Sequence, residues 1–182
     1  MNAKLQFAWN FLLHPIRNAS LVPSSSFACK AMLQGIDFSS IKTVVELGPG
    51  TGVFTEEILK RCRPDTKVLL VEIEETYVSL LVKKFDNRII IENAGAHLFA
   101  ELLAKHGIEK VDLIISGLPV SLPENIKTKF FVALRTHTEA GAIFRFLTLN
   151  PPLMRSAYQG LPIRKISFVF SNIPPLWVYG IN

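Results

Sequence analysis

Short apolar runs alternate along the chain with segments whose apolar residues recur at helical spacing. The first such run, residues 43–47, predicts a buried strand, and Phe54, Ile58 and Leu59 then mark one side of a helix. The same alternation continues to residue 147. It predicts strands over residues 43–47, 68–71, 88–91, 111–115 and 142–147, and helices over residues 54–61, 77–85, 98–106 and 125–137.

The end of the chain departs from this alternation, because two apolar runs, residues 166–170 and 176–179, follow each other without a helix. Alternating strands and helices form a parallel sheet with helices on both faces, and two consecutive strands indicate a β-hairpin at its edge. We therefore expect an α/β fold with a mostly parallel, seven-stranded sheet. Residues 1–40 are predicted to form an N-terminal helical cap on residues 41–182, within a single structural domain.

Composition narrows the class of protein. Of the 182 residues, 49% are hydrophobic and 19% are charged, so the chain can bury a sizeable core and disorder is excluded as its main state. No stretch approaches the roughly 20 uninterrupted apolar residues of a membrane-spanning helix. Cys29 and Cys62 have no metal or redox spacing and the N-terminus has no signal-peptide pattern, which predicts a cytoplasmic protein without a metal. The net charge of +5 favours an anionic partner, either nucleic acid or an acidic membrane surface.

A glycine-rich turn, Glu-Leu-Gly-Pro-Gly-Thr-Gly over residues 46–52, follows the first predicted strand and opens the first helix. Such a turn lets the backbone approach a ligand closely at the carboxyl edge of a parallel sheet. Glu72 follows the second predicted strand, where a carboxylate can accept hydrogen bonds from two ribose hydroxyls. Glu46 would repel a pyrophosphate but suits the ammonium group of an amino acid or an ordered water. The turn and the two acids therefore predict a nucleoside-cofactor site.

The turn resembles the first motif of the class I S-adenosylmethionine-dependent methyltransferases, E-x-G-x-G-x-G. The resemblance implies a Rossmann-like fold, S-adenosyl-L-methionine as cofactor and S-adenosyl-L-homocysteine as product. Related enzymes often bind the adenine amine with an Asp after the third strand. Here Ala94 stands at that position, so Asn93 or the backbone would supply the oxygen. The cofactor-binding residues expected from the resemblance are Ser25, Glu46, Gly48, Pro49, Gly50, Thr51, Gly52, Glu72, Ile73, Asn93, Ala94, Gly95 and Ser116.

The acceptor side is expected after the fourth strand, at Ser-Gly-Leu-Pro-Val over residues 116–120. Methyltransferases that act on nucleic-acid amines carry Asn or Asp here, followed by proline and an aromatic residue that stacks on the base. The ribosomal-RNA adenine dimethylases have a close variant with Asn and a final Tyr. Gly117 and Val120 replace the polar and the aromatic residue. These replacements count against a nucleic-acid substrate.

This acceptor segment is instead similar to that of the bacterial phospholipid N-methyltransferases that act on phosphatidylethanolamine. The resemblance extends to residues 11–15 and 21–28 near the N-terminus, to residues 44–55 around the glycine turn, and to Asn-Ile-Pro-Pro-Leu-Trp-Val-Tyr at 172–179. It covers nearly the whole chain. The resemblance implies transfer of methyl groups to the amine of a phosphatidylethanolamine-type phospholipid at the membrane surface.

Methyl transfer to nitrogen is an in-line displacement, for which an enzyme mainly aligns donor and acceptor. The amine must arrive neutral, since an ammonium has no lone pair. Backbone carbonyls of residues 116–118 would orient the nitrogen, while a base or water takes the proton. The residues proposed for catalysis are His14, Ser116, Gly117, Leu118, Tyr158 and Tyr179, although each tyrosine has a packing role as its alternative and His14 can simply end a helix.

The N-terminal segment has the pattern of an interfacial helix. Asn2, Gln6, Asn10 and His14 recur every four positions and form one polar stripe, and apolar residues that include Trp9 cover the rest. This pattern predicts peripheral contact with an anionic membrane, with a cap helix packed on the core as the alternative. Residues 22–26 would then form a lid over the cofactor, in which Ser24 or Ser25 caps the next helix.

Two other functions stay open at this point. The basic net charge is also compatible with an RNA adenine N-methyltransferase similar to the ribosomal-RNA dimethylases. Alternatively, Ala94 marks a degenerate cofactor pocket, and the chain is a binding module without activity.

Overall fold

The computed structural model describes residues 24–85, 89–120, 122–172 and 174–181. They form one seven-stranded sheet with the order β3-β2-β1-β4-β5-β7-β6. Strands β1 to β5 are parallel to one another, and β7 is antiparallel to both β5 and β6. The strands are β1 (Thr43–Leu47), β2 (Lys67–Glu72), β3 (Ile89–Asn93), β4 (Leu113–Ser116), β5 (Ile143–Thr148), β6 (Arg164–Val169) and β7 (Leu176–Ile181). The predicted parallel sheet with a hairpin at its edge is therefore confirmed.

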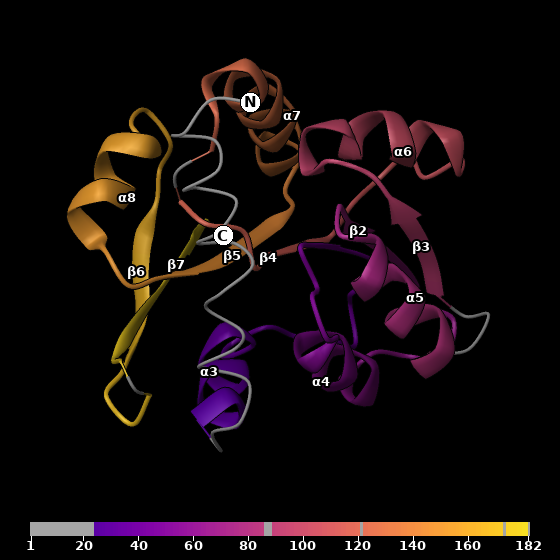
Figure 1. Ribbon diagram of the computed structural model, residues 1–182, viewed down its shortest axis with the longest axis horizontal. Helices are drawn as coiled ribbons and strands as arrows, with labels where there is room; N and C mark the ends of the chain where they lie inside the picture. Colours follow the sequence, from indigo (N-terminus) through magenta and orange to yellow (C-terminus); the bar gives the residue numbers. More distant parts are fainter. Residues whose placement is uncertain (1–23, 86–88, 121, 173, 182) are drawn as a thin grey trace.

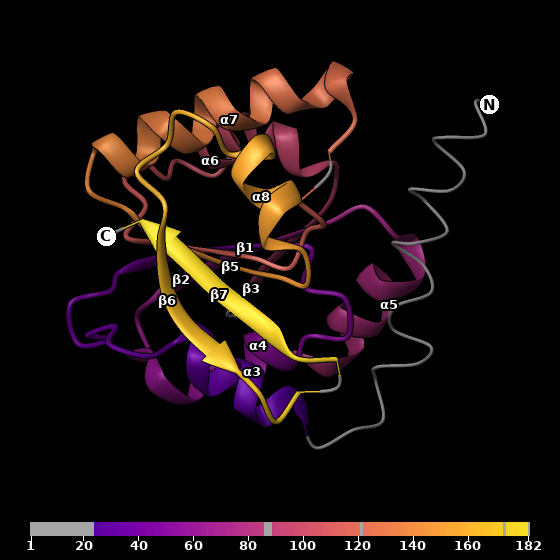
Figure 2. The same ribbon diagram turned by 90° about the vertical axis from the view of Figure 1, so that its left-hand side faces the viewer.

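Helices cover both faces of this sheet, as the alternation of elements predicts (Figures 1 and 2). One layer contains α3 (Ser24–Met32), α4 (Val53–Arg61) and α5 (Glu75–Lys84), and the other contains α6 (Phe99–Lys105), α7 (Glu124–Glu139) and α8 (Pro151–Ala157). A 3₁₀ turn, Ala96–Leu98, precedes α6. Among the described residues, no helix is long and apolar enough to cross a bilayer.

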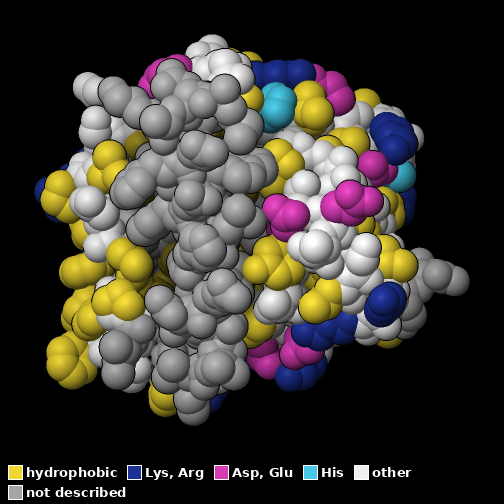
Figure 3. Space-filling view, viewed as in Figure 1, with side chains coloured by type: hydrophobic (Ala, Val, Ile, Leu, Met, Phe, Trp, Pro, Cys, Tyr) yellow, Lys and Arg dark blue, Asp and Glu magenta, His cyan; other side chains and the backbone are white. Residues whose placement is uncertain are grey.

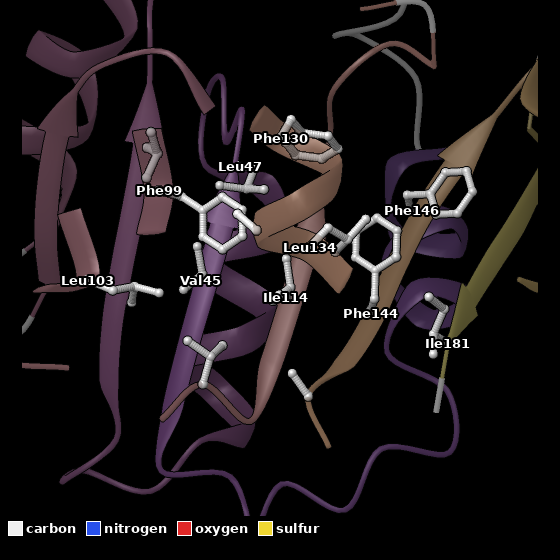
Figure 4. Close-up of a cluster of buried hydrophobic side chains, with 14 of the residues drawn as sticks. Val45, Leu47, Phe99, Leu103, Ile114, Phe130, Leu134, Phe144, Phe146 and Ile181 are labelled. Atoms are coloured by element: carbon white, nitrogen blue, oxygen red, sulfur yellow. The ribbon is translucent and has the colours of Figure 1, made fainter. Parts of the chain in front are cut away.

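Two hydrophobic clusters hold the layers together. All five residues of β1 are buried, and successive side chains alternate between the clusters: Val44 lies in one, and Val45 and Leu47 lie in the other. The larger cluster joins β1, β4 and β5 to helices α6 and α7 through Phe99 and Phe130, whose ring centroids are 6.3 Å apart (Figure 4). Strands buried on both faces are typical of a parallel sheet between two helical layers.

Helix α8 is an element that the hydrophobic pattern did not predict. Its N-cap is Asn150, whose side chain accepts a hydrogen bond from the Leu153 backbone N–H at 3.1 Å. Two prolines occupy its first positions, where a missing N–H is not needed for helical hydrogen bonding. With seven residues and only Met154 buried, the helix is too short to produce a clear apolar period.

Helix α3 belongs to the sheet's covering layer. Its residues Ala28 and Met32, with Leu33 directly after it, are buried in the cluster that contains Val44 and Leu113. The second half of the predicted N-terminal cap therefore packs on the sheet as part of the same hydrophobic core. The first half, residues 1–23, lies outside the described residues, as does the predicted interfacial helix.

Candidate active site

The loops that leave β1 to β4 meet at the carboxyl edge of the sheet. The Gly48 N–H donates to the Val71 carbonyl at 2.9 Å, and the Ala94 N–H donates to the Glu72 carbonyl at 3.0 Å. The Gly117 N–H donates to the Leu47 carbonyl at 2.8 Å. The structure thus brings the glycine turn, Glu72, residues 93–95 and residues 116–118 together, as the sequence predicts for neighbouring parallel strands.

Backbone conformation explains why glycine occupies three positions of the turn. Gly48, Gly50 and Gly52 have φ values of 69°, 56° and 78°, in the left-handed region that residues with a side chain rarely adopt. A Cβ atom on Gly52 would also lie 2.7 Å from the ring of Phe85. The turn can therefore bend tightly between β1 and α4 only with glycine at these positions.

Glu72 closes the turn from the neighbouring strand. One of its carboxylate oxygens accepts the Gly50 N–H at 3.0 Å, and the other accepts the N–H groups of Ile73 and Glu74 at 2.9 and 3.0 Å. The side chain is buried. A single carboxylate thus links the exit of β2 to the glycine turn, at the position predicted for ribose recognition.

Glu46 is a buried carboxylate with one satisfied oxygen. The residue is 1% exposed, and its Oε2 accepts a hydrogen bond from the Thr55 hydroxyl at 2.6 Å. Its Oε1 is buried and has no hydrogen-bond partner among the described residues. Burial raises the pKa of Glu46 to about 7, and the nearby charge of Glu72 adds to the rise. Such a carboxylate is stabilised by a cation that approaches Oε1.

The segment after β3 holds a buried polar atom that sequence reasoning missed. The Asn93 amide nitrogen donates to the carbonyls of Glu72 and Ile73, at 3.0 and 3.1 Å, and so braces the loop. The His97 Nδ1 atom is buried and lacks a partner among the described residues, and a Cβ atom on Gly95 would lie 2.6 Å from its ring. The signal in the sequence is a histidine three positions beyond Ala94.

The acceptor segment contacts the glycine turn through its backbone. A Cβ atom on Gly117 would lie 2.6 Å from the Gly48 carbonyl oxygen, so a side chain does not fit there without movement of the backbone. The Ser116 side chain is buried, and its hydroxyl accepts the Leu118 N–H at 3.3 Å. Val120 is buried in the core. The segment therefore presents backbone next to the glycine turn, with neither an amide side chain nor an aromatic ring at positions 117 and 120.

Comparison with known proteins identifies the family. The model of the family described as ribosomal RNA adenine dimethylase matches residues 24–131. This chain belongs to that family. The fold agrees, since the chain is similar to TrmN from Thermus thermophilus (TM-score 0.60, 16% identity, 90% of this chain and 53% of that chain). It is also similar to the N-methyltransferase NodS from Bradyrhizobium japonicum WM9 (TM-score 0.58, 12% identity, 87% of this chain and 96% of that chain).

Two curated relatives differ in how much of the chain they match. The ornithine lipid N-methyltransferase of Singulisphaera acidiphila is 31% identical over 179 residues, which cover 95% of this chain and 92% of that protein. The ribosomal RNA small subunit methyltransferase A of Mycoplasma mycoides is 33% identical over 97 residues, which cover 52% of this chain and 35% of that protein. The chain thus spans about a third of the length of the ribosomal relative and nearly all of the lipid relative.

Methyltransferases of the dimethylase family and of this fold use S-adenosylmethionine, and the residues at the carboxyl edge suit it. The unpartnered Glu46 Oε1 fits an ammonium group, alone or through a water. The left-handed glycines leave room for backbone to approach a ligand. Among the described residues, no cluster of His, Cys, Asp or Glu could hold a metal ion.

The remaining predicted catalytic residues are His14 and two tyrosines, and both tyrosines are buried in the core. His14 lies outside the described residues. Tyr158 is 4% exposed, its ring is stacked 4.5 Å from that of Phe146, and burial raises the pKa of its hydroxyl well above the ordinary range. Tyr179 is also buried, with its ring 6.1 Å from that of Phe146. These contacts favour the packing alternative for both tyrosines. For Tyr158 the raised pKa adds to this, because a phenol that keeps its proton is a poor base.

Proposed function

We propose that this member of the dimethylase family transfers methyl groups from S-adenosylmethionine to the primary amine of a membrane lipid. The observation that carries the proposal is the acceptor segment. Gly117 has no room for a side chain against the Gly48 carbonyl, and Val120 is buried. A flipped base would lack both the side-chain acceptor for its amine and the ring on which to stack. An aliphatic amine needs neither.

The match to the lipid-methylating relative supports the same assignment. It covers 95% of this chain, whereas the family model ends at residue 131. That relative is named for ornithine lipid, whereas the motifs of the sequence point to phosphatidylethanolamine. Both lipids present a primary amine, so we propose this amine as the common acceptor and leave the headgroup to experiment.

The chain's own residues would act mainly by alignment. The Gly117 N–H to Leu47 carbonyl bond and the close approach of Gly117 to Gly48 set the acceptor segment directly against the cofactor turn. S-adenosylmethionine, when bound, supplies a methyl group on a sulfonium that needs little further activation. The backbone carbonyls of residues 116–118 would orient the neutral amine along the line of transfer, and water would take the proton. A free primary amine titrates at about pH 10, so activity should rise with pH.

Peripheral membrane contact through the N-terminal segment stays part of this proposal. The polar stripe and the apolar face of residues 2–14 support it at the level of sequence. A lipid amine lies at the bilayer surface, so an enzyme that acts on it needs such contact. Removal of residues 2–13 should weaken vesicle binding more than it weakens binding of S-adenosylhomocysteine.

RNA methylation is the second candidate, because the family model and several relatives are named for ribosomal RNA. The experiment that tests the first candidate uses vesicles that contain either ornithine lipid or phosphatidylethanolamine. After incubation with enzyme and S-adenosylmethionine, mass spectrometry of the extracted lipids should detect methylated amines in at least one vesicle type. A Gly50→Arg variant, strained at φ 56° and blocked at the turn, should give none. Unmodified lipid in both vesicle types, from protein that binds S-adenosylhomocysteine, would contradict the proposal.

A further inference from the structure

The hairpin at the edge of the sheet carries an exposed aromatic cluster. Phe168 and Phe170 are 45% and 79% exposed. The Phe168 ring centroid lies 6.4 Å from that of Phe170 and 4.9 Å from that of Trp177. We call Phe168, Phe170 and Trp177 the hairpin patch. Large apolar side chains grouped on a surface mark an interaction site more often than scattered ones do.

The hairpin patch lies at the same edge of the sheet as the candidate active site. Phe168 is paired with Trp177, and Trp177 is paired with Thr148, the last residue of β5. The carboxyl end of β5 is in turn next to that of β4, which leads into Gly117. Leu149 and Leu153, which follow β5, are also exposed. Figure 1 shows β6, β7 and α8 on the left of the molecule and β3 on the right, at the other end of the sheet.

The segment that forms the hairpin carries no acidic side chain. The sequence has no Asp or Glu before Asp37 and none after Glu139, so residues 140–182 contain only basic charges. Figure 3 shows apolar side chains over the β6–β7 hairpin, while most acidic side chains in view lie on the opposite half. The exposed basic residues of α3, α8 and β6 are Lys30, Arg155, Arg164 and Lys165.

We propose that the hairpin patch docks on an anionic lipid bilayer and so brings the acceptor segment to the membrane surface. Aromatic side chains insert at the level of the lipid headgroups, and basic residues near them are attracted to anionic lipids. Absence of acidic side chains from this part of the sequence removes repulsion from the same headgroups. The location next to β5 and β4 would direct the carboxyl edge toward the lipid amines. The identity of the lipid substrate rests on the proposed function, whereas the docking surface rests on the exposure and ring contacts of Phe168, Phe170 and Trp177.

A double variant, Phe168→Ser with Phe170→Ser, tests the hairpin patch. We expect about a tenfold or greater loss of binding to sedimenting vesicles of phosphatidylglycerol and phosphatidylethanolamine, with binding of S-adenosylhomocysteine unchanged. Val82→Ser is the matched control, since Val82 is 58% exposed on α5, away from the hairpin. If the double variant does not fold, Phe170→Ser alone replaces it in the test, because Phe170 lies outside β6. Vesicle binding equal to that of the original protein would overturn the inference.

A further comparison separates this inference from the proposed function. The variant should lose methyl transfer to vesicle lipid but keep it toward a short-chain aminolipid dispersed below its micelle concentration. If the original protein methylates neither lipid yet binds vesicles through Phe168 and Phe170, the proposed function fails and the docking surface stands. If the variant instead dissociates a dimer in solution, at unchanged vesicle binding, the patch is a protein interface and the inference is wrong.

Discussion

The two ends of the sheet differ in chemistry. Strands β1 to β3 and their loops carry the glycine turn and two buried carboxylates, Glu46 and Glu72. Strands β5, β7 and β6 carry no acidic side chain, and their exposed edge is aromatic. The family model stops at residue 131, whereas the lipid-methylating relative matches 95% of the chain. The end formed by β1 to β3, which we call the first end, therefore identifies the family and its cofactor. We infer that the second end, formed by β5, β7 and β6, decides the acceptor.

This difference predicts that variants at the two ends separate cofactor binding from acceptor use. A defect at the first end should affect every acceptor equally, because all of them need the same cofactor. A defect at the second end should leave the binding of S-adenosylhomocysteine intact. The following variants test this separation in order of expected effect.

Glu72→Gln should have the largest effect. The Glu72 carboxylate accepts N–H groups from Gly50, Ile73 and Glu74, and the amide of a glutamine cannot accept at both ends. Hydrogen bonds to charged groups contribute about 1.5–3 kcal/mol, so calorimetric titration should show roughly 100-fold weaker binding of S-adenosylhomocysteine. Glu75→Gln, an exposed neighbour on α5, is the control. Unchanged affinity in Glu72→Gln would place the cofactor elsewhere.

Gly117→Ala tests the junction between the two ends. The new Cβ atom would meet the Gly48 carbonyl oxygen at 2.6 Å, so the backbone of one of the two segments must shift. A misplacement of this kind should lower kcat for lipid methylation by about tenfold or more. Binding of S-adenosylhomocysteine should fall by less than kcat. A variant with normal kcat would contradict the role that we assign to this contact.

Glu46→Gln should change how stability depends on pH. Burial raises the pKa of Glu46 from 4.5 to about 7, so the folded protein retains a proton that the unfolded chain releases. The free energy of unfolding should therefore fall as pH rises between these values, by up to about 3 kcal/mol. Glu46→Gln should remove that fall and raise stability at about pH 8. Denaturant titrations at several pH values measure it, and parallel curves for the two proteins would contradict the burial of this charge.

Ionised Glu46 should lower the stability of the free protein but increase its affinity for the cofactor. A cationic ammonium near Oε1 favours the ionised carboxylate, so affinity for S-adenosylhomocysteine should weaken as pH falls below about 7. The Glu46→Gln variant should bind more weakly above that pH and show a flatter profile. A group that costs stability in the free protein would then serve ligand binding.

Tyr158→Phe should have the smallest effect. The hydroxyl is buried, and the ring is stacked on Phe146 with an interplanar angle of 6°. Phenylalanine keeps this packing, so kcat should stay within about twofold of the original value. A large loss of kcat at unchanged melting temperature would restore the catalytic role that the sequence first suggested for Tyr158.

The elements that could be predicted from sequence are those with a strong apolar period. The strand over residues 43–47 has the bounds observed for β1, and the helix predicted over 54–61 begins one residue after the observed start of α4 at Val53. Helix α8 was missed because it is short and capped by Asn150 and two prolines, which read as a turn. The start of β6 at Arg164 was missed because its first two residues are charged.

The residues of the candidate site also differ in how far the sequence could predict them. Glu46, Glu72 and the glycines could be placed because strand ends and turn residues leave a pattern in sequence. The steric reason for Gly117 could not, because it depends on a contact with Gly48 from another strand. The packing of Tyr158 under Phe146, and the buried nitrogen of His97, also arise from tertiary contacts that sequence spacing does not encode.

Competition between the two acceptors in one reaction distinguishes lipid methylation from RNA methylation. Purified protein would receive S-adenosylmethionine with a labelled methyl group, in one reaction that contains both aminolipid vesicles and small-subunit ribosomal RNA. Extraction then separates labelled lipid from labelled RNA. We expect label in the lipid and only background in the RNA. Label in the RNA with none in the lipid would contradict the proposed function.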